Sequence, residues 1–181
     1  MLIACEFSGR VRDAFLARGH DAWSCDLDGT ERKGPHIQGD VLEHLGDGWD
    51  LMIAHPPCTY LAVSGARWFR EQKDKQAQAL DFVRSLLEAS IPRIALENPV
   101  SVISTRIRKP DQIVHPWMFG DPETKATCLW LKGLPVLMPT NPVKPNGKSA
   151  IHNESPGWER RRKRSRTFKG LAQAMAEQWG H

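Results

Sequence analysis

The chain has 181 residues, of which 40% are hydrophobic and 25% charged, as expected for one soluble globular domain with a single core. No stretch approaches the ~18 apolar residues of a membrane span, and no signal peptide is recognisable at the N-terminus. The four cysteines are far apart in sequence, which argues against a zinc site or a disulfide framework and favours the reducing cytoplasm.

Positive charge is concentrated in one place. The net charge is +4, but residues 160–166 (RRRKRSR) carry six positive charges, so the rest of the chain is slightly acidic. Contact with a polyanion is therefore expected near the C-terminus, with a solvated tail as the alternative interpretation.

The first part of the chain has the layout of a nucleotide-binding α/β unit. A turn at Ser8-Gly9 separates an apolar strand from an amphipathic helix, and the next strand ends in Asp26. The turn holds one glycine where a dinucleotide fingerprint holds three, so this signal is weak by itself. The elements expected here are a strand over 2–7, a helix over 10–18, a strand over 21–26 and a short strand over 38–42 that carries Asp40.

Residues 55–65 (HPPCTYLAVSG) are the stretch around which the chain is organised. A buried strand over 49–54 precedes them, and two prolines end that strand because they cannot donate hydrogen bonds to a sheet. Cys58 is therefore expected at the carboxyl end of a central strand, where open α/β sheets bind their ligands. The alternative is a small buried thiol, and His55 is interpreted as structural rather than catalytic.

The second half of the chain repeats this arrangement once and then becomes irregular. Glu97 lies at the tip of another buried strand, where a carboxylate usually has a partner or a function. The remaining elements expected are a helix over 67–89, a strand over 93–99, an irregular connection over 101–122, a strand over 127–134, an extended proline-rich segment over 135–156 and a closing helix over 168–179. Alternating strands and helices of this kind predict an α/β fold.

Three motifs thus follow one another: Phe7-Ser8-Gly9 after the first strand, Pro56-Pro57-Cys58 after a central strand, and Glu97-Asn98 at the end of the next. Their order resembles that of the DNA cytosine-5 methyltransferases. The resemblance implies a Rossmann-like, S-adenosylmethionine-dependent methyltransferase fold with a mostly parallel central sheet. It also implies a short, phage- or prophage-type member that lacks a full target-recognition domain, with residues 1–181 as a single catalytic domain.

The resemblance also implies roles for individual residues. Cys58 is the expected nucleophile, which adds to the cytosine ring so that carbon 5 can attack a sulfonium methyl group. Glu97 is expected to assist by binding ring nitrogen 3 and the exocyclic amine. Lys125 stands where the family has the first arginine of a Q-x-R-x-R motif, and Thr127 where it has the second. The residues implied for S-adenosylmethionine are Phe7, Gly9, Asp26, Asp40 and Pro56, and no metal is expected.

DNA is the expected partner, bound as a duplex at a short cytosine-containing target with the base flipped out of the stack. Residues 135–166 are too few for a separate core, so they are expected to form a reduced recognition loop. A C-terminal helix within 167–181 is expected to return to the core. The residues expected to contact DNA are Arg160, Arg161, Arg162, Arg164, Arg166 and Ser64.

Other functions stay open at this point. An RNA cytosine-5 methyltransferase would use the same cysteine and glutamate chemistry. A non-catalytic methyltransferase fold that binds nucleic acid is the alternative from another class, motivated by the thin glycine turn and by the departures at Lys125 and Thr127. An amino-group methyltransferase is disfavoured because its loop carries an aromatic residue where this chain has Cys58.

Overall fold

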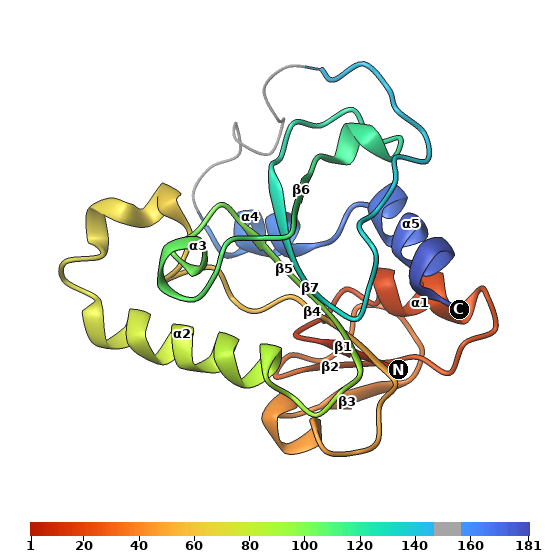
Figure 1. The fold of residues 1–181 in the computed structure, drawn as a ribbon, viewed down its shortest axis with the longest axis horizontal. Coiled ribbons are helices and arrows are strands. Elements are labelled where there is room, and N and C mark those ends of the chain that lie inside the picture. The colour runs from red at the N-terminus through yellow and green to blue at the C-terminus, as the bar shows by residue number, and fades with distance from the viewer. Residues whose placement is uncertain (147–156) are drawn as a thin grey trace.

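The computed structural model of the protein describes residues 1–146 and 157–181, and its centre is a seven-stranded sheet (Figure 1). The strands lie in the order β3-β2-β1-β4-β5-β7-β6, and neighbours are parallel except in the two pairs that involve β7. The strands span Leu2–Ala4 (β1), Trp23–Asp26 (β2), His36–Gln38 (β3), Leu51–Ala54 (β4), Arg93–Pro99 (β5), Gln112–Val114 (β6) and Thr127–Lys132 (β7). The predicted Rossmann-like α/β fold with a mostly parallel central sheet is confirmed.

Helices cover both faces of this sheet (Figure 1). The α-helices span Arg10–Leu16 (α1), Lys73–Leu87 (α2), Ile103–Arg106 (α3), Trp158–Ser165 (α4) and Lys169–Trp179 (α5), and the 3₁₀ turns span Val41–His44 (η1), Val63–Trp68 (η2) and Pro116–Met118 (η3). One core cluster joins strand residues such as Leu2 and Met52 to α2, and the other joins Ile3 and Ile53 to α1 and α5. Successive side chains of a strand point to opposite faces of the sheet, which produces this division. Both faces are covered, so the polar side chains lie at the carboxyl ends of the strands.

Two elements differ from the expectation for local reasons. The predicted helix over 67–89 is wrong in its first part: residues 67–68 end the 3₁₀ turn η2, the amides of Glu71 and Gln72 donate to carbonyls three residues earlier, and α2 begins only at Lys73. The predicted strand over 38–42 is also wrong. The Asp40 carboxylate accepts a hydrogen bond from the Leu42 amide at 3.0 Å, which ends the extended backbone and starts η1. The connection over 101–122 contains α3 and β6, which its irregular pattern does not reveal.

The segment expected to form a recognition loop, 135–166, falls partly on 147–156, outside the described residues. Residues 135–146 run extended beside η3, where the amides of Asn141 and Val143 donate to carbonyls of the 117–118 turn. The basic run is helical, because it lies largely within α4. Within 1–146 and 157–181, no helix has the length and apolar character needed to cross a bilayer.

Candidate active site

The carboxyl ends of β4 and β5 bring two of the sequence motifs together. The parallel register pairs Ala54 with Leu96, so the residues that follow β4 lie beside the last residues of β5. His55 Nδ1 lies 3.0 Å from Glu97 Oε2, and the side-chain amide of Asn98 donates to the Pro56 carbonyl at 2.9 Å. The Pro-Pro-Cys loop is therefore tied to the Glu-Asn pair at two successive positions.

Cys58 lies two residues after Pro56, and it is exposed at the start of a turn. The amides of Leu61 and Ala62 both donate to its carbonyl, at 3.0 and 2.9 Å, and this fixes the loop beyond the two prolines. Partial loss of water around the sulfur raises the pKa of the Cys58 thiol, and the Glu97 carboxylate raises it further, while Lys125 and Arg164 act in the opposite direction. The thiol is accessible, and it needs nearby positive charge to become a thiolate.

Glu97 is the most enclosed acid at this edge, with 13% of its side chain exposed. Burial alone would raise the pKa of Glu97, but the hydrogen bond from His55 and the charges of Lys125 and His55 hold it below its ordinary value. The carboxylate form is therefore the stable one at neutral pH.

Lys125 reaches the same edge from the segment that precedes β7. Because β7 runs antiparallel to β5 and pairs Thr127 with Pro99, this segment passes over the end of the Glu-Asn-Pro motif. Lys125 Nζ donates to the carbonyl of Arg164 at 3.1 Å, which links the edge to α4. Thr127 is buried, and its hydroxyl donates to the Lys125 carbonyl at 3.4 Å, so it faces the backbone instead of an open site.

The turn after β1 is built around a carboxylate. Glu6 is buried, and its oxygens accept hydrogen bonds from the amides of Val11 at 2.7 Å and Arg12 at 3.2 Å, at the start of α1. Gly9 adopts a φ of 67°, and a Cβ there would lie 2.5 Å from the Arg12 guanidinium, so glycine is required. The helix N-terminus that would hold a phosphate in a dinucleotide site is occupied by the protein's own acid.

The predicted cofactor acids lie at the same edge, one at the end of β2 and one shortly after β3. Asp26 ends β2 and accepts the Asp28 amide at 3.0 Å, and the exposed Asp40 begins η1. Burial raises the pKa of Asp26, although the hydrogen bond from Asp28 opposes this. Burial raises the pKa of the Cys5 thiol as well, and the charges of both aspartates add to that effect, so the three side chains share one region.

Helix α4 lies over this region and uses two of the arginines predicted to contact DNA. The Arg162 guanidinium lies 4.5 Å from the centroid of the Phe7 ring, and its Nε donates to Glu31 at 2.9 Å. Arg166 binds the same carboxylate through two nitrogens, at 2.9 and 2.8 Å. These hydrogen bonds, chiefly that from Arg166, lower the pKa of Glu31.

The other predicted site residues are more dispersed. Arg164 is exposed, and its charge acts on Cys58, whereas Ser64 is exposed on η2. Pro56 is buried, and its carbonyl is used by Asn98. The side chains of Arg160 and Arg161 lie outside the described part of the chain.

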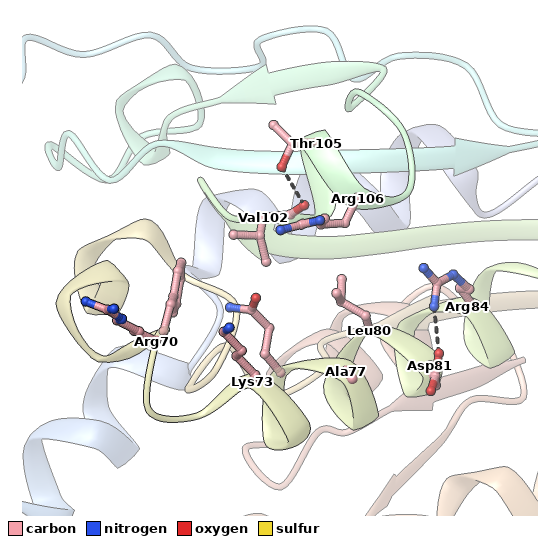
Figure 2. A pocket seen from close by; sticks show the side chains of 11 residues that line it. Arg70, Lys73, Ala77, Leu80, Asp81, Arg84, Val102, Thr105 and Arg106 are labelled. Atoms are coloured by element: carbon pink, nitrogen blue, oxygen red, sulfur yellow. Dashed lines mark hydrogen bonds and ion pairs between the residues drawn. The ribbon is translucent and has the colours of Figure 1, made fainter.

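A basic groove of about 710 Å³ lies between α2 and α3, next to the Cys58 loop (Figure 2). Gln76 in this groove donates to the Tyr60 carbonyl at 3.0 Å, which joins it to that loop. Its charged residues are Arg70, Lys73, Asp81, Arg84 and Arg106, of which Asp81 and Arg84 pair at 2.6 Å. The other three cations form no ion pair with any residue that the structure describes.

Sequence reasoning missed this groove and interpreted His55 as structural. No signal in the sequence marks the groove, because its cations come from segments that meet only in the fold. His55 could have been found from the strand pattern: the residue directly after β4 must lie beside the end of β5.

Comparisons with known proteins add a distant likeness. No family model matches the chain, and no curated protein matches it. Among solved structures, the chain is similar to one described as a candidate DNA modification methyltransferase encoded within a prophage of Escherichia coli, with 17% identity and a TM-score of 0.48. The similarity covers 80% of this chain and 53% of that one, so the chain spans about half the length of that structure. A likeness at this level assigns no function, which has to be argued from the site itself.

Proposed function

We propose that the protein transfers a methyl group from S-adenosylmethionine to carbon 5 of cytosine in DNA. The observation that carries this proposal is that three residues meet at one edge of the sheet. Cys58 follows β4, Glu97 lies near the end of β5, and Lys125 lies on the segment before β7. An exposed thiol, an enclosed carboxylate and a cation are the groups that nucleophilic addition to a cytosine ring requires.

The neighbouring cofactor region fits a nucleoside without phosphates. Glu6 occupies the amides at the start of α1, so a pyrophosphate would meet a carboxylate there. The carboxylates of Asp26 and Asp40 suit the ribose hydroxyls and the adenine amino group, and both act on the thiol of Cys5, which places them in one region. When bound, S-adenosylmethionine supplies an electrophilic methyl group. Phe7, Gly9 and Pro56 complete the residues proposed to contact it.

In the proposed mechanism, the Cys58 sulfur forms a bond to carbon 6 of a flipped-out cytosine. The electron pair of the 5,6 double bond moves toward ring nitrogen 3, which takes a proton at Glu97, and carbon 5 becomes nucleophilic. The charge of Lys125 favours the thiolate of Cys58 and the carboxylate of Glu97. Carbon 5 then takes the methyl group, whose bond to the sulfonium sulfur breaks and leaves a neutral thioether. Loss of the carbon 5 proton to water and return of the nitrogen 3 proton to Glu97 expel the thiolate and restore the double bond.

The DNA backbone has two candidate surfaces on the chain. Arg162 on α4 and Arg166 directly after it are already paired with Glu31, whereas three cations of the basic groove form no ion pair among the described residues. We therefore assign the larger share of the phosphate contacts to the groove, which borders the Cys58 loop. Segment 135–166 would then make a few base contacts, each worth ~1–3 kcal/mol of discrimination, at a target of about two to four base pairs.

The test is methyl transfer itself. The purified protein is incubated with tritiated S-adenosylmethionine and duplex DNA, and the product is sequenced after cytosine conversion. We expect label in DNA at carbon 5 of cytosines in a short motif, and none with Cys58→Ala. Label on exocyclic amines, or transfer to RNA alone, would show that the substrate assignment is wrong.

A further inference from the structure

His55 lies beside the proposed catalytic carboxylate, and only one of its two ring nitrogens has a hydrogen-bond partner among the described residues. Its side chain is 7% exposed, and Nδ1 lies 3.0 Å from Glu97 Oε2. The other ring nitrogen, Nε2, is buried and has no hydrogen-bond partner among the described residues. A buried imidazole nitrogen without a partner is costly, which points to a function for the contact on the other side of the ring.

The geometry determines where a proton can reside. Nε2 has no partner among the described residues whether or not it carries a proton, whereas a proton on Nδ1 has the Glu97 carboxylate directly in front of it. The pair therefore holds its exchangeable proton between Nδ1 and Oε2.

The proposed reaction needs that proton. Glu97 is held in its carboxylate form at neutral pH, and a carboxylate can accept a hydrogen bond from the cytosine amine but has no proton for ring nitrogen 3. A second group must supply it. Of the groups whose charge acts on Glu97, His55 is the one that both contacts the carboxylate and can gain or lose a proton near pH 7.

We infer that His55 is a positioning residue that holds the proton which Glu97 delivers to ring nitrogen 3 of the target base. The inference rests on the proposed function. His55 begins as an imidazolium; as the Cys58 thiolate bonds to carbon 6, its Nδ1 proton passes through Glu97 to nitrogen 3, and the ring is left neutral with its remaining proton on Nε2. After carbon 5 has taken the methyl group, the proton returns from nitrogen 3 to the pair, so one proton is lent and recovered in each turnover.

The charged and titratable neighbours of the pair come from four places. Cys58 lies on the same loop, Lys125 precedes β7, Arg164 lies on α4, and Cys128 lies on β7. The charge of Lys125 acts on both Glu97 and Cys58, so a Lys125 variant would change the pKa of both groups and could not distinguish between them. Replacing His55 itself can.

The test measures single-turnover adduct formation on DNA that carries 5-fluorocytosine, at saturating DNA and cofactor, as a function of pH. The rate needs both the Cys58 thiolate and the protonated pair. Because the pKa of Cys58 is raised, the acidic limb of the profile belongs to the pair and the basic limb to Cys58. His55→Asn keeps a donor near Nδ1 but cannot ionise, which leaves Glu97 alone to bind the proton.

We expect His55→Asn to move the acidic limb to lower pH and to lower the plateau by one factor of ten for each pH unit of that movement. An ordinary imidazole and an ordinary carboxyl group differ by about two pH units in pKa, and burial of Glu97 reduces this difference, so the plateau should be slower by up to roughly 100-fold. The basic limb, which belongs to Cys58, should stay in place. A structural role would lower the rate without moving the acidic limb, and that outcome would overturn the inference.

His44→Asn is the matched control, because His44 Nδ1 also pairs with a carboxylate, that of Asp47 at 2.9 Å, on the surface. Its profile should match the wild type, and a shift as large as that of His55→Asn would contradict the inference. If the wild type itself forms no adduct, the proposed function fails instead.

Should His55→Asn not fold, the wild type still provides a test through nitrogen-15 spectra of its histidine rings. The inference needs a charged His55 ring in the pH range in which the adduct forms, and Glu97→Gln should lower the charged fraction of that ring because the carboxylate no longer stabilises the imidazolium. A His55 ring that stays neutral throughout would overturn the inference.

Discussion

The carboxyl ends of β4 and β5 are assembled differently from those of β1 and β2. At the β4–β5 edge, strand register sets the contacts, and the His55–Glu97 and Asn98–Pro56 hydrogen bonds join residues that directly follow or end the two strands. At the β1–β2 edge, long-range ion pairs hold α4 in place, since Glu31 binds Arg162 and Arg166 from the far end of the chain. The proposed chemistry thus depends on the sheet itself, whereas the cover of the proposed cofactor region depends on surface charge. Mutations at the two edges should therefore have separable effects.

The largest effect is expected at the β4–β5 edge. Glu97→Gln keeps the shape of the side chain but removes its ability to carry a proton. The rate of adduct formation should fall by roughly 10²- to 10⁴-fold. Binding of S-adenosylmethionine, measured by calorimetry, should stay within about twofold of wild type. A large loss of cofactor affinity would show that the two edges are not separable.

The opposite pattern is expected for Asp26→Ala at the β1–β2 edge. Losing hydrogen bonds to a carboxylate costs about 2 kcal/mol, or roughly 30-fold in cofactor affinity, while adduct formation at saturating cofactor should change little. Because burial raises the pKa of Asp26, the wild-type affinity should begin to fall on acidification at a higher pH than for an exposed aspartate. Unchanged affinity in a titration would place the ribose contact elsewhere.

The same contrast extends to the two basic regions, one beside each edge. Replacing Arg70, Lys73 and Arg106 by alanine should weaken DNA binding about tenfold and reduce the salt slope by about 0.9 for each lost contact, without changing the methylated motif. Replacing Arg161, Arg162 and Arg164 should weaken binding to all sequences alike, and by less, since Arg162 is already paired. A change of motif in the second variant would show that α4 reads bases.

The smallest effect is expected for Glu31→Gln, which releases α4. The Glu31 pairs are partly exposed, so the free energy of unfolding should fall by only about 1 kcal/mol. The folded-state pKa of Glu31 is lowered, so this contribution is present above the unfolded-state pKa and is lost as the pH falls through the folded value. The stability difference between variant and wild type should therefore vanish in acid. Asp81→Asn, which breaks the more exposed pair with Arg84, is the control and should cost less.

The sequence predicts the β4–β5 edge better than the contacts that hold α4 and form the basic groove. The pattern of buried strands places Cys58 and Glu97 at neighbouring strand ends, because parallel strands bring their carboxyl ends to one edge. It cannot place α4 against Glu31 or gather the cations of the groove, since both depend on packing between residues far apart in sequence. The second and third glycines of a dinucleotide turn are missing for a physical reason: the Glu6 carboxylate takes the amides that a phosphate would use.

The covalent step is the central claim, and trapping tests it most directly. The wild type is incubated with S-adenosylmethionine and duplex DNA that carries 5-fluorocytosine, which blocks release of the adduct, and the complex is digested and mapped by mass spectrometry. We expect one modified peptide, carrying the base on Cys58, and no adduct with Cys58→Ser. An adduct at another residue, or a Cys58→Ser variant that still methylates DNA at the wild-type rate, would contradict the account.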